Sequence, residues 1–103
     1  GKMNKQMLRQ AQELQARLAK AQEELANATV EGSAGGGAVK IVMNGHQEVQ
    51  SVKISPEAVD PQDVALLEDM ILAAFKDGFT KAQDLTQKRM GAITGGLKIP
   101  GLM

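Results

Sequence analysis

Three basic side chains near the start of the chain have a spacing that points to anion binding. Lys2, Lys5 and Arg9 follow one another at intervals of three and four residues, so a helix would place them on one side. A row of cations on an exposed helix attracts anions, and a phosphate backbone is an anion of matching extent. The alternative is a solvated surface, because such rows also occur where nothing binds.

Charge is distributed unevenly along a chain whose net charge is zero. The first twenty positions hold five basic residues and one acidic residue, whereas residues 57–77 hold six acidic residues and one basic residue. From residue 81 onward, four basic residues face a single acidic one. This asymmetry directs an anion toward the two ends of the chain even though the total charge is neutral.

Few residues are suited to catalysis or metal binding. His46 is the only histidine and falls in a predicted turn, which favours a solvated turn residue over a general base. The glycine run at 32–37, GSAGGG, lacks the following Lys-Ser or Lys-Thr of a phosphate-binding loop. Cysteine is absent, and no His, Asp and Glu cluster has metal-ligand spacing. We therefore expect no catalytic residue, no metal site, no cofactor and no small-molecule substrate.

Composition indicates an ordinary globular domain. Hydrophobic residues make up 43% of the chain and charged residues 23%. The longest apolar run, residues 70–75, is too short to cross a bilayer, and no signal-peptide pattern is present. We expect a cytoplasmic protein that does not enter a membrane.

The first helix is predicted over residues 3–28, a stretch without glycine or proline. At 1.5 Å per residue it measures roughly 38 Å, so part of it must extend beyond a small sheet. Apolar residues recur along it at alternating spacings of four and three: Met7, Ala11, Leu14, Leu18, Ala21, Leu25 and Ala28. This seam is typical of a coiled coil with a second copy, and the alternative partner is the second helix of the same chain.

Three short strands are predicted at residues 29–33, 38–43 and 48–54. Three glycines at 35–37 form the first turn, and Asn44-Gly45, lengthened by His46 and Gln47, forms the second. The short connections predict an antiparallel meander. Val49 breaks the alternation set by Val52 and Ile54, which predicts a bulge or burial on both faces in the third strand.

The second helix is predicted over residues 61–90, with Asp60 as its N-cap and Gly91 as its terminator. Its apolar face is wider than one small sheet requires, which indicates a subunit interface. We predict an α+β fold: one domain at 1–92 with α-β-β-β-α order, two long helices and an intertwined homodimer, followed by a flexible tail at 93–103. The predicted dimer interface includes Leu14, Leu18, Leu67, Ile71 and Phe75.

Several segments together resemble the YbaB/EbfC family of bacterial nucleoid-associated proteins. They are 30-VEGSAGGGAVKIVMNG-45, 52-VKISPE-57, 70-MILAAF-75 and 94-TGGLKIPGLM-103. The resemblance implies homodimers with projecting helical arms that bind double-stranded DNA and influence nucleoid organisation and gene expression. One departure is Ser55, where the family often has an acidic residue. The basic positions that the resemblance assigns to DNA binding are Lys2, Lys5, Arg9, Lys20, Lys81, Lys88 and Arg89.

The aromatic residues favour duplex DNA over single strands. Phe75 and Phe79 belong to the predicted core face, which leaves no exposed ring on which unpaired bases would stack. We therefore expect a non-enzymatic protein of the nucleoid that contacts duplex phosphates. The alternative is a protein-interaction adaptor that docks a partner through the helical seam or the C-terminal tail.

Overall fold

The computed structural model describes residues 4–95 and begins with a long helix, α1 (Lys5–Asn27). The side chain of Asn4 caps it by accepting a hydrogen bond from the backbone N–H of Met7 at 2.7 Å. The helix ends at Ala28, whose backbone is extended. The predicted helix over 3–28 is confirmed for residues 5–27, and its predicted first residue, Met3, lies outside the described residues.

The sheet is an antiparallel meander in the order β1-β2-β3, as predicted. Its strands are β1 (Thr29–Ala34), β2 (Val39–Asn44) and β3 (Val49–Ile54), within one residue of the predicted limits. A bulge occurs in β3, because Val42 pairs with Ser51 whereas Met43 pairs with Val49, which leaves Gln50 unmatched. This register places Val49 on the same face of the sheet as Val52 and Ile54.

The second helix, α2 (Val64–Thr94), begins three residues later than predicted. Asp63 is its N-cap and accepts a hydrogen bond from the N–H of Leu66 at 3.2 Å. Asp60, the predicted cap, instead accepts from the N–H of Gln62 at 2.9 Å and forms a turn ahead of the helix. The assignment of Asp60 was wrong because two aspartates near Pro61 have capping chemistry, and the first of them closes the turn.

Gly91 does not end α2, contrary to the prediction. The helix continues to Thr94, whose hydroxyl donates to the carbonyl oxygen of Met90 at 3.0 Å. A glycine inside a helix lowers the stability of the helix by only about 1 kcal/mol relative to alanine. The hydrogen bonds on either side of Gly91 are therefore enough to continue the helix. The predicted tail therefore loses residues 93 and 94 to the helix, and its positions 96–103 lie outside the described residues.

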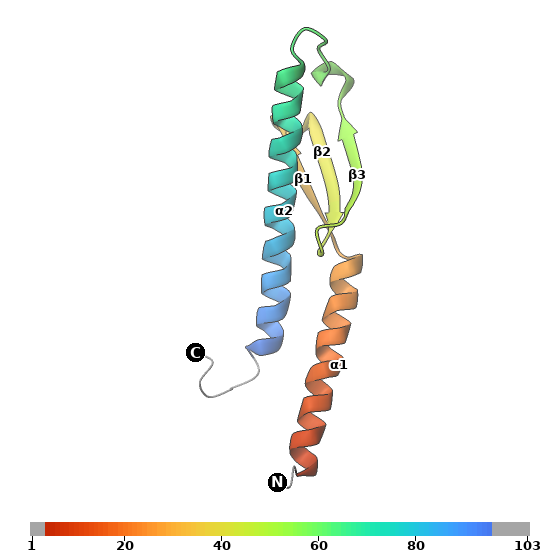
Figure 1. Cartoon of the computed structure of the whole chain (residues 1–103), viewed down its shortest axis with the longest axis vertical. Helices are drawn as coiled ribbons and strands as arrows, with labels where there is room; N and C mark the ends of the chain where they lie inside the picture. Colours follow the sequence, from red (N-terminus) through yellow and green to blue (C-terminus); the bar gives the residue numbers. More distant parts are fainter. Residues whose placement is uncertain (1–3, 96–103) are drawn as a thin grey trace.

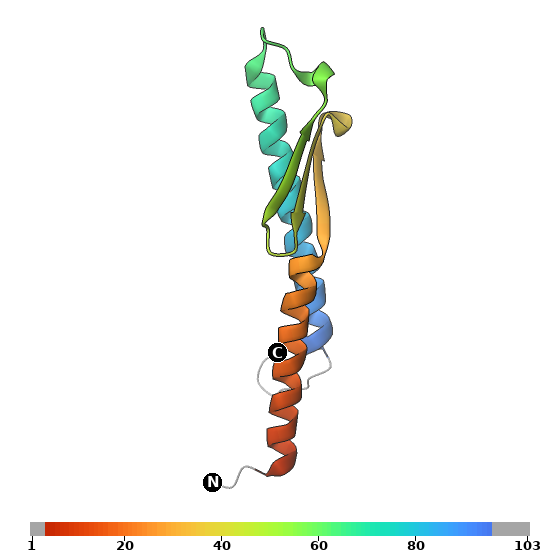
Figure 2. The same cartoon turned by 90° about the vertical axis from the view of Figure 1, so that its right-hand side faces the viewer.

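The core lies between α2 and the first two strands (Figures 1 and 2). The fully buried side chains of Val39, Ile41 and Met43 on β2 pack against α2 at Ala74 and Ala82. The closest approach is made by glycines: a Cβ at Gly32 would lie 2.2 Å from the carbonyl oxygen of Ala74. The absence of a side chain at this position is therefore what allows helix and strand to touch.

The molecule is elongated, with extents of 72 × 25 × 19 Å. Its sheet and the first half of α2 occupy one end, and α1 projects from the other end, past the sheet (Figure 1). Every residue from Asn4 to Glu13 is exposed. We call residues 4–20 the arm. None of the helices within residues 4–95 has both the length and the hydropathy to span a membrane.

Candidate nucleic-acid interface

The cations of the arm have no ion-pair partner among the described residues, a property that Lys40, Lys53, Lys76 and Lys88 share. Lys5, Arg9, Arg17 and Lys20 are all exposed. In the part of the chain that the structure describes, the two ion pairs are Lys81 with Asp77 and Arg89 with Glu24, so none of the arm cations is paired. Lys2, which would extend the row, lies outside the described residues.

Arg17 was not among the predicted contacts, although its side chain is as accessible as the others. It lies eight residues after Arg9, so a helix turns it about 80° away from the predicted row. The spacing rule that found the row therefore passed over it. Because most residues of the arm are exposed, a ligand can also reach Arg17.

Lys81 is engaged within its own subunit, on the side of α2 next to β1. Its ammonium group lies 3.1 Å from a carboxylate oxygen of Asp77 and donates to the carbonyl oxygen of Glu31 at 2.9 Å. A hydrogen bond from the backbone N–H of Ser33, together with Lys81, holds the pKa of Asp77 below its ordinary value. This network joins α2 to β1 and leaves Lys81 less available to an external anion.

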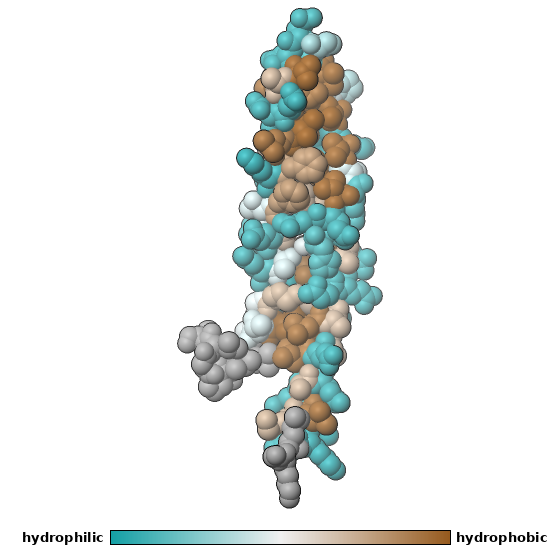
Figure 3. Space-filling view, in the orientation of Figure 1, coloured by the Kyte–Doolittle hydropathy of each residue, from teal (hydrophilic) through white to brown (hydrophobic). Residues whose placement is uncertain are grey.

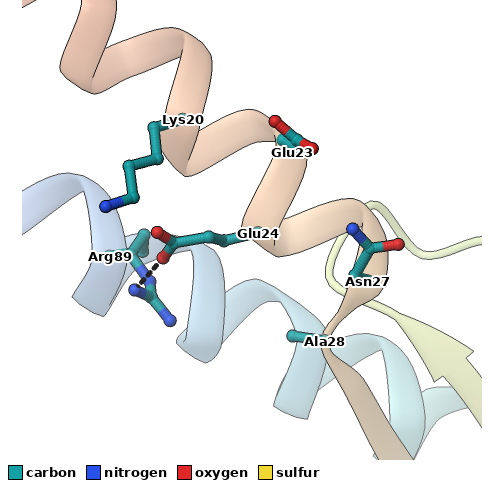
Figure 4. A pocket seen from close by; sticks show the side chains of 6 residues that line it. All are labelled: Lys20, Glu23, Glu24, Asn27, Ala28 and Arg89. Atoms are coloured by element: carbon teal, nitrogen blue, oxygen red, sulfur yellow. Dashed lines mark hydrogen bonds and ion pairs between the residues drawn. The ribbon is translucent and has the colours of Figure 1, made fainter.

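Lys20 and Arg89 are brought together by the fold. They line an open groove between α1 and α2, together with Glu23, Glu24, Asn27 and Ala28. Figure 4 shows Lys20 and Glu24 pointing toward Arg89, and Glu23 pointing away from it. The guanidinium of Arg89 forms an ion pair with Glu24, which links the two helices. Lys88, the neighbour of Arg89, is exposed.

The seven predicted contacts thus divide into separate groups. Lys5 and Arg9 lie free along the arm, and Lys20 and Arg89 share the groove. Lys81 lies eight residues before Arg89, roughly 12 Å along the helix axis, and is held against β1. The structure therefore brings Lys20 and Arg89 together in one groove, and holds Lys81 apart from them.

A second notable surface is apolar and lies over β3. Val39, Ile41 and Met43 of β2 pair with Ile54, Val52 and Val49 respectively, so all six side chains share the sheet face that α2 covers. The three on β2 are fully buried, whereas those on β3 are 36–45% exposed. We call the strip formed by Val49, Val52 and Ile54 the β3 strip.

Exposed apolar residues also lie on α2. Leu66 and Leu72 are more than half exposed, and Phe79 is 38% exposed. Figure 3 shows apolar side chains gathered over the upper half of α2 and beside it. Of the predicted interface residues, Leu67, Ile71 and Phe75 are partly buried against the core, Leu14 is partly buried and Leu18 is 36% exposed.

The seam of α1 is used in two ways. Ala21 and Leu25 are buried within the subunit, which corresponds to the alternative of packing inside the chain. Met7, Ala11 and Leu18, farther along the arm, are exposed. Seam spacing alone did not reveal this division, because it depends on where α2 ends relative to α1.

His46 is held in the turn between β2 and β3. Its Nε2 atom lies 3.0 Å from the carbonyl oxygen of Gln22, and its backbone N–H donates to the side chain of Asn44. Residues 4–95 contain no group of three or more His, Cys, Asp or Glu side chains placed to hold a metal ion.

The α-β-β-β-α order and the projecting first helix agree with the fold that the family resemblance implies. The sequence profile of the YbaB/EbfC DNA-binding family matches residues 1–97. The chain belongs to this family.

Named relatives agree with this assignment, and a solved structure shares the fold. A nucleoid-associated protein of Pelotomaculum thermopropionicum is 55% identical over 102 residues, covering 99% of this chain and 96% of the relative. One from Chloroflexus aurantiacus is 54% identical over 94 residues, covering 91% and 94% respectively. The crystal structure of an uncharacterized protein from Helicobacter pylori superposes with a TM-score of 0.71 at 17% identity, covering 94% of this chain and all of that one. That last likeness concerns the fold alone.

Proposed function

We propose that this protein is a homodimer that binds double-stranded DNA, chiefly through its phosphates, in the nucleoid of the cytoplasm. There it would contribute to nucleoid organisation and gene regulation without enzymatic activity. The observation that carries the proposal is the arm, an exposed helix whose four described cations have no partner within the described chain. Relatives named nucleoid-associated proteins support it.

Phosphate contact follows from the chemistry of the arm. Lysine and arginine side chains on an exposed helix reach several phosphates of a duplex, and each contact releases condensed counterions. The expectation that neither ring is exposed was wrong for Phe79, which is 38% exposed, whereas Phe75 is partly buried against the core. The centroids of the two rings lie 5.9 Å apart. Neither belongs to the arm, so stacking of unpaired bases has no support beside the cations.

The β3 strip supports the homodimer. α2 packs on β1 and β2 but leaves the same sheet face open over β3, so one subunit covers only part of this face. A second copy offers a helix with matching apolar residues, Leu66 and Leu72 among them. Covering the β3 strip with α2 of the second copy would bury both surfaces at once and would give an intertwined dimer.

A duplex titration tests the proposal. Labelled duplex and single strand of the same sequence are titrated with the full chain, while light scattering reports its mass. We expect a dimer that prefers the duplex. A monomer at micromolar concentration would contradict the dimer, and a preference for the single strand would contradict phosphate contact along a duplex.

The second candidate is a protein-interaction adaptor. Met7 and Leu18, which share the seam of α1, are 57% and 36% exposed on the arm, and an apolar helix face of this kind accepts a partner helix. Purification with and without nuclease separates the two candidates. Nucleic acid that co-purifies and is removed by nuclease supports DNA binding, whereas a protein that remains after nuclease treatment supports the adaptor.

A further inference from the structure

An ion pair between Glu24 and Arg89 lies in the groove between α1 and α2. Arg89 comes from α2 and Glu24 from the last turns of α1, 65 residues apart in the chain. Lys20 points into the same groove from one helical turn earlier on α1 (Figure 4). A single carboxylate therefore lies where two cationic side chains converge, which is also the position that a phosphate group would take.

The groove is open to an incoming anion. The side chain of Arg89 is 40% exposed and that of Glu24 is 35% exposed, so solvent reaches both partners. Exposed ion pairs are weak because water and salt screen them. A phosphate offers a guanidinium the same paired oxygen acceptors as a carboxylate, with a larger charge distributed along the duplex.

We propose that Glu24 is an internal substitute for a DNA phosphate: it pairs with Arg89 in the free protein and is displaced by the backbone when a duplex binds. This inference rests on the proposed DNA-binding function and adds a specific competitor to it. Glu24 restrains binding, because the pair must open before Arg89 reaches the duplex. Arg89 is held ready in the groove until then.

The test compares two substitutions that change the net charge equally. Glu24→Gln removes the competing carboxylate, and Glu23→Gln removes the adjacent one, which points away from Arg89. If opening the pair limits binding, Glu24→Gln tightens duplex binding about two- to fivefold for each copy of the chain. Glu23→Gln provides only the general gain from losing one negative charge, which we expect to be less than about twofold.

The same pair of substitutions in an Arg89→Met background isolates the mechanism. Without the guanidinium, Glu24 has lost its ion-pair partner, so Glu24→Gln should lose its advantage over Glu23→Gln. Arg89→Met alone should weaken duplex binding, a readout that does not depend on how Glu24→Gln folds. Thermal melting of each variant reports whether it is folded.

The outcomes separate this inference from the proposed function. A wild-type chain that fails to bind duplex contradicts the proposed function itself. A wild-type chain that binds, with Glu24→Gln no better than Glu23→Gln or worse than wild type, overturns the inference and assigns the pair to holding the two helices together. An advantage of Glu24→Gln that persists in the Arg89→Met background also overturns it.

Discussion

Lys5 and Arg9 carry charge that no other group in residues 4–95 neutralises by an ion pair. They project from the arm opposite the apolar seam, so their role can be altered without touching the core. Exposed substitutions of this kind usually change the free energy of unfolding by less than about 0.5 kcal/mol. A change in DNA binding at these positions therefore reports on contact and not on folding.

Replacing both residues by glutamate should lower duplex affinity by more than about tenfold, because two cations become two anions in each copy. The melting temperature should remain close to that of the wild type. Fluorescence anisotropy with a labelled duplex measures the affinity, and circular dichroism measures melting.

The matched control makes the opposite change of charge at another exposed pair. Glu68 and Asp69 lie on the first part of α2, away from the arm, and their replacement by lysine should not weaken duplex binding. If the double glutamate variant is folded and binds as tightly as wild type, the row is solvated surface and the adaptor becomes the better candidate.

Sequence located the single cations but not their partners. Arg89 was identified as basic and near the end of a helix, yet its pairing with Glu24 depends on how α1 and α2 cross. The hydrogen bond from Lys81 to Glu31 likewise spans 50 residues. No periodic pattern in the sequence predicts such contacts, because they form between elements whose relative placement depends on the packing of the core.

At the scale of elements, the alternation of apolar residues and the turn chemistry predicted the strands to within one residue. For the third strand they left a bulge and burial on both faces as alternatives, and the register shows the bulge. The sequence predicted the first residue of α2 less accurately than the ends of the strands. Asp60 and Asp63 both have capping side chains, and only the hydrogen bond from Gln62 to Asp60 shows which one closes the preceding turn. The cap of a helix is a choice between local geometries of similar free energy.

Alanine substitutions at two glycines test how the elements pack. We expect one substitution to lower the free energy of unfolding and the other to raise it. Gly32→Ala would place a Cβ 2.2 Å from a backbone oxygen of Ala74, so helix and strand must separate. We expect a loss of about 1–3 kcal/mol or more in the free energy of unfolding. Gly91→Ala meets nothing within 4 Å and should stabilise by about 0.5–1 kcal/mol, because alanine is the better helix former.

Urea unfolding of both variants measures these differences. A Gly32→Ala variant as stable as wild type would mean that α2 does not approach β1 closely. A destabilised Gly91→Ala variant would mean that α2 does not continue through position 91.

At the scale of the whole molecule, lysine substitutions on the two faces of β3 test the proposed dimer interface. Val52 belongs to the β3 strip, whereas Ser51 lies on the opposite face of β3 and is also exposed. In the single subunit both positions accept a lysine. If α2 of a second copy covers the β3 strip, only a lysine at position 52 is buried without a partner, which is strongly unfavourable.

We therefore expect Val52→Lys to convert the dimer to a monomer and Ser51→Lys to leave it intact. Gel filtration with light scattering at micromolar concentration measures the masses. Equal dimer masses for both variants would place the interface elsewhere, and the exposed part of the α1 seam, with Leu18, would be the next surface to alter.

The sequence suggested a dimer because the apolar residues of α2 exceed what one sheet can cover, but it did not identify β3 as the uncovered strand. Which strands lie under α2 follows from the glycine contact between β1 and α2, where Gly32 meets Gly78. That contact draws the helix toward β1 and leaves β3 open. The arm was predictable for a simpler reason: a helix of such length cannot be covered by strands of six residues.

Salt dependence tests the dimer and its arms together. If the dimer neutralises about six phosphates, the logarithm of its affinity should fall with the logarithm of salt concentration at a slope of about −5, so a fourfold rise in salt weakens binding about a thousandfold. The variant with glutamate at positions 5 and 9 should give a shallower slope, since it makes fewer phosphate contacts. Duplex titrations at several salt concentrations measure both slopes. An affinity indifferent to salt would contradict backbone contact, and equal slopes for the two proteins would place the contacts outside the arm.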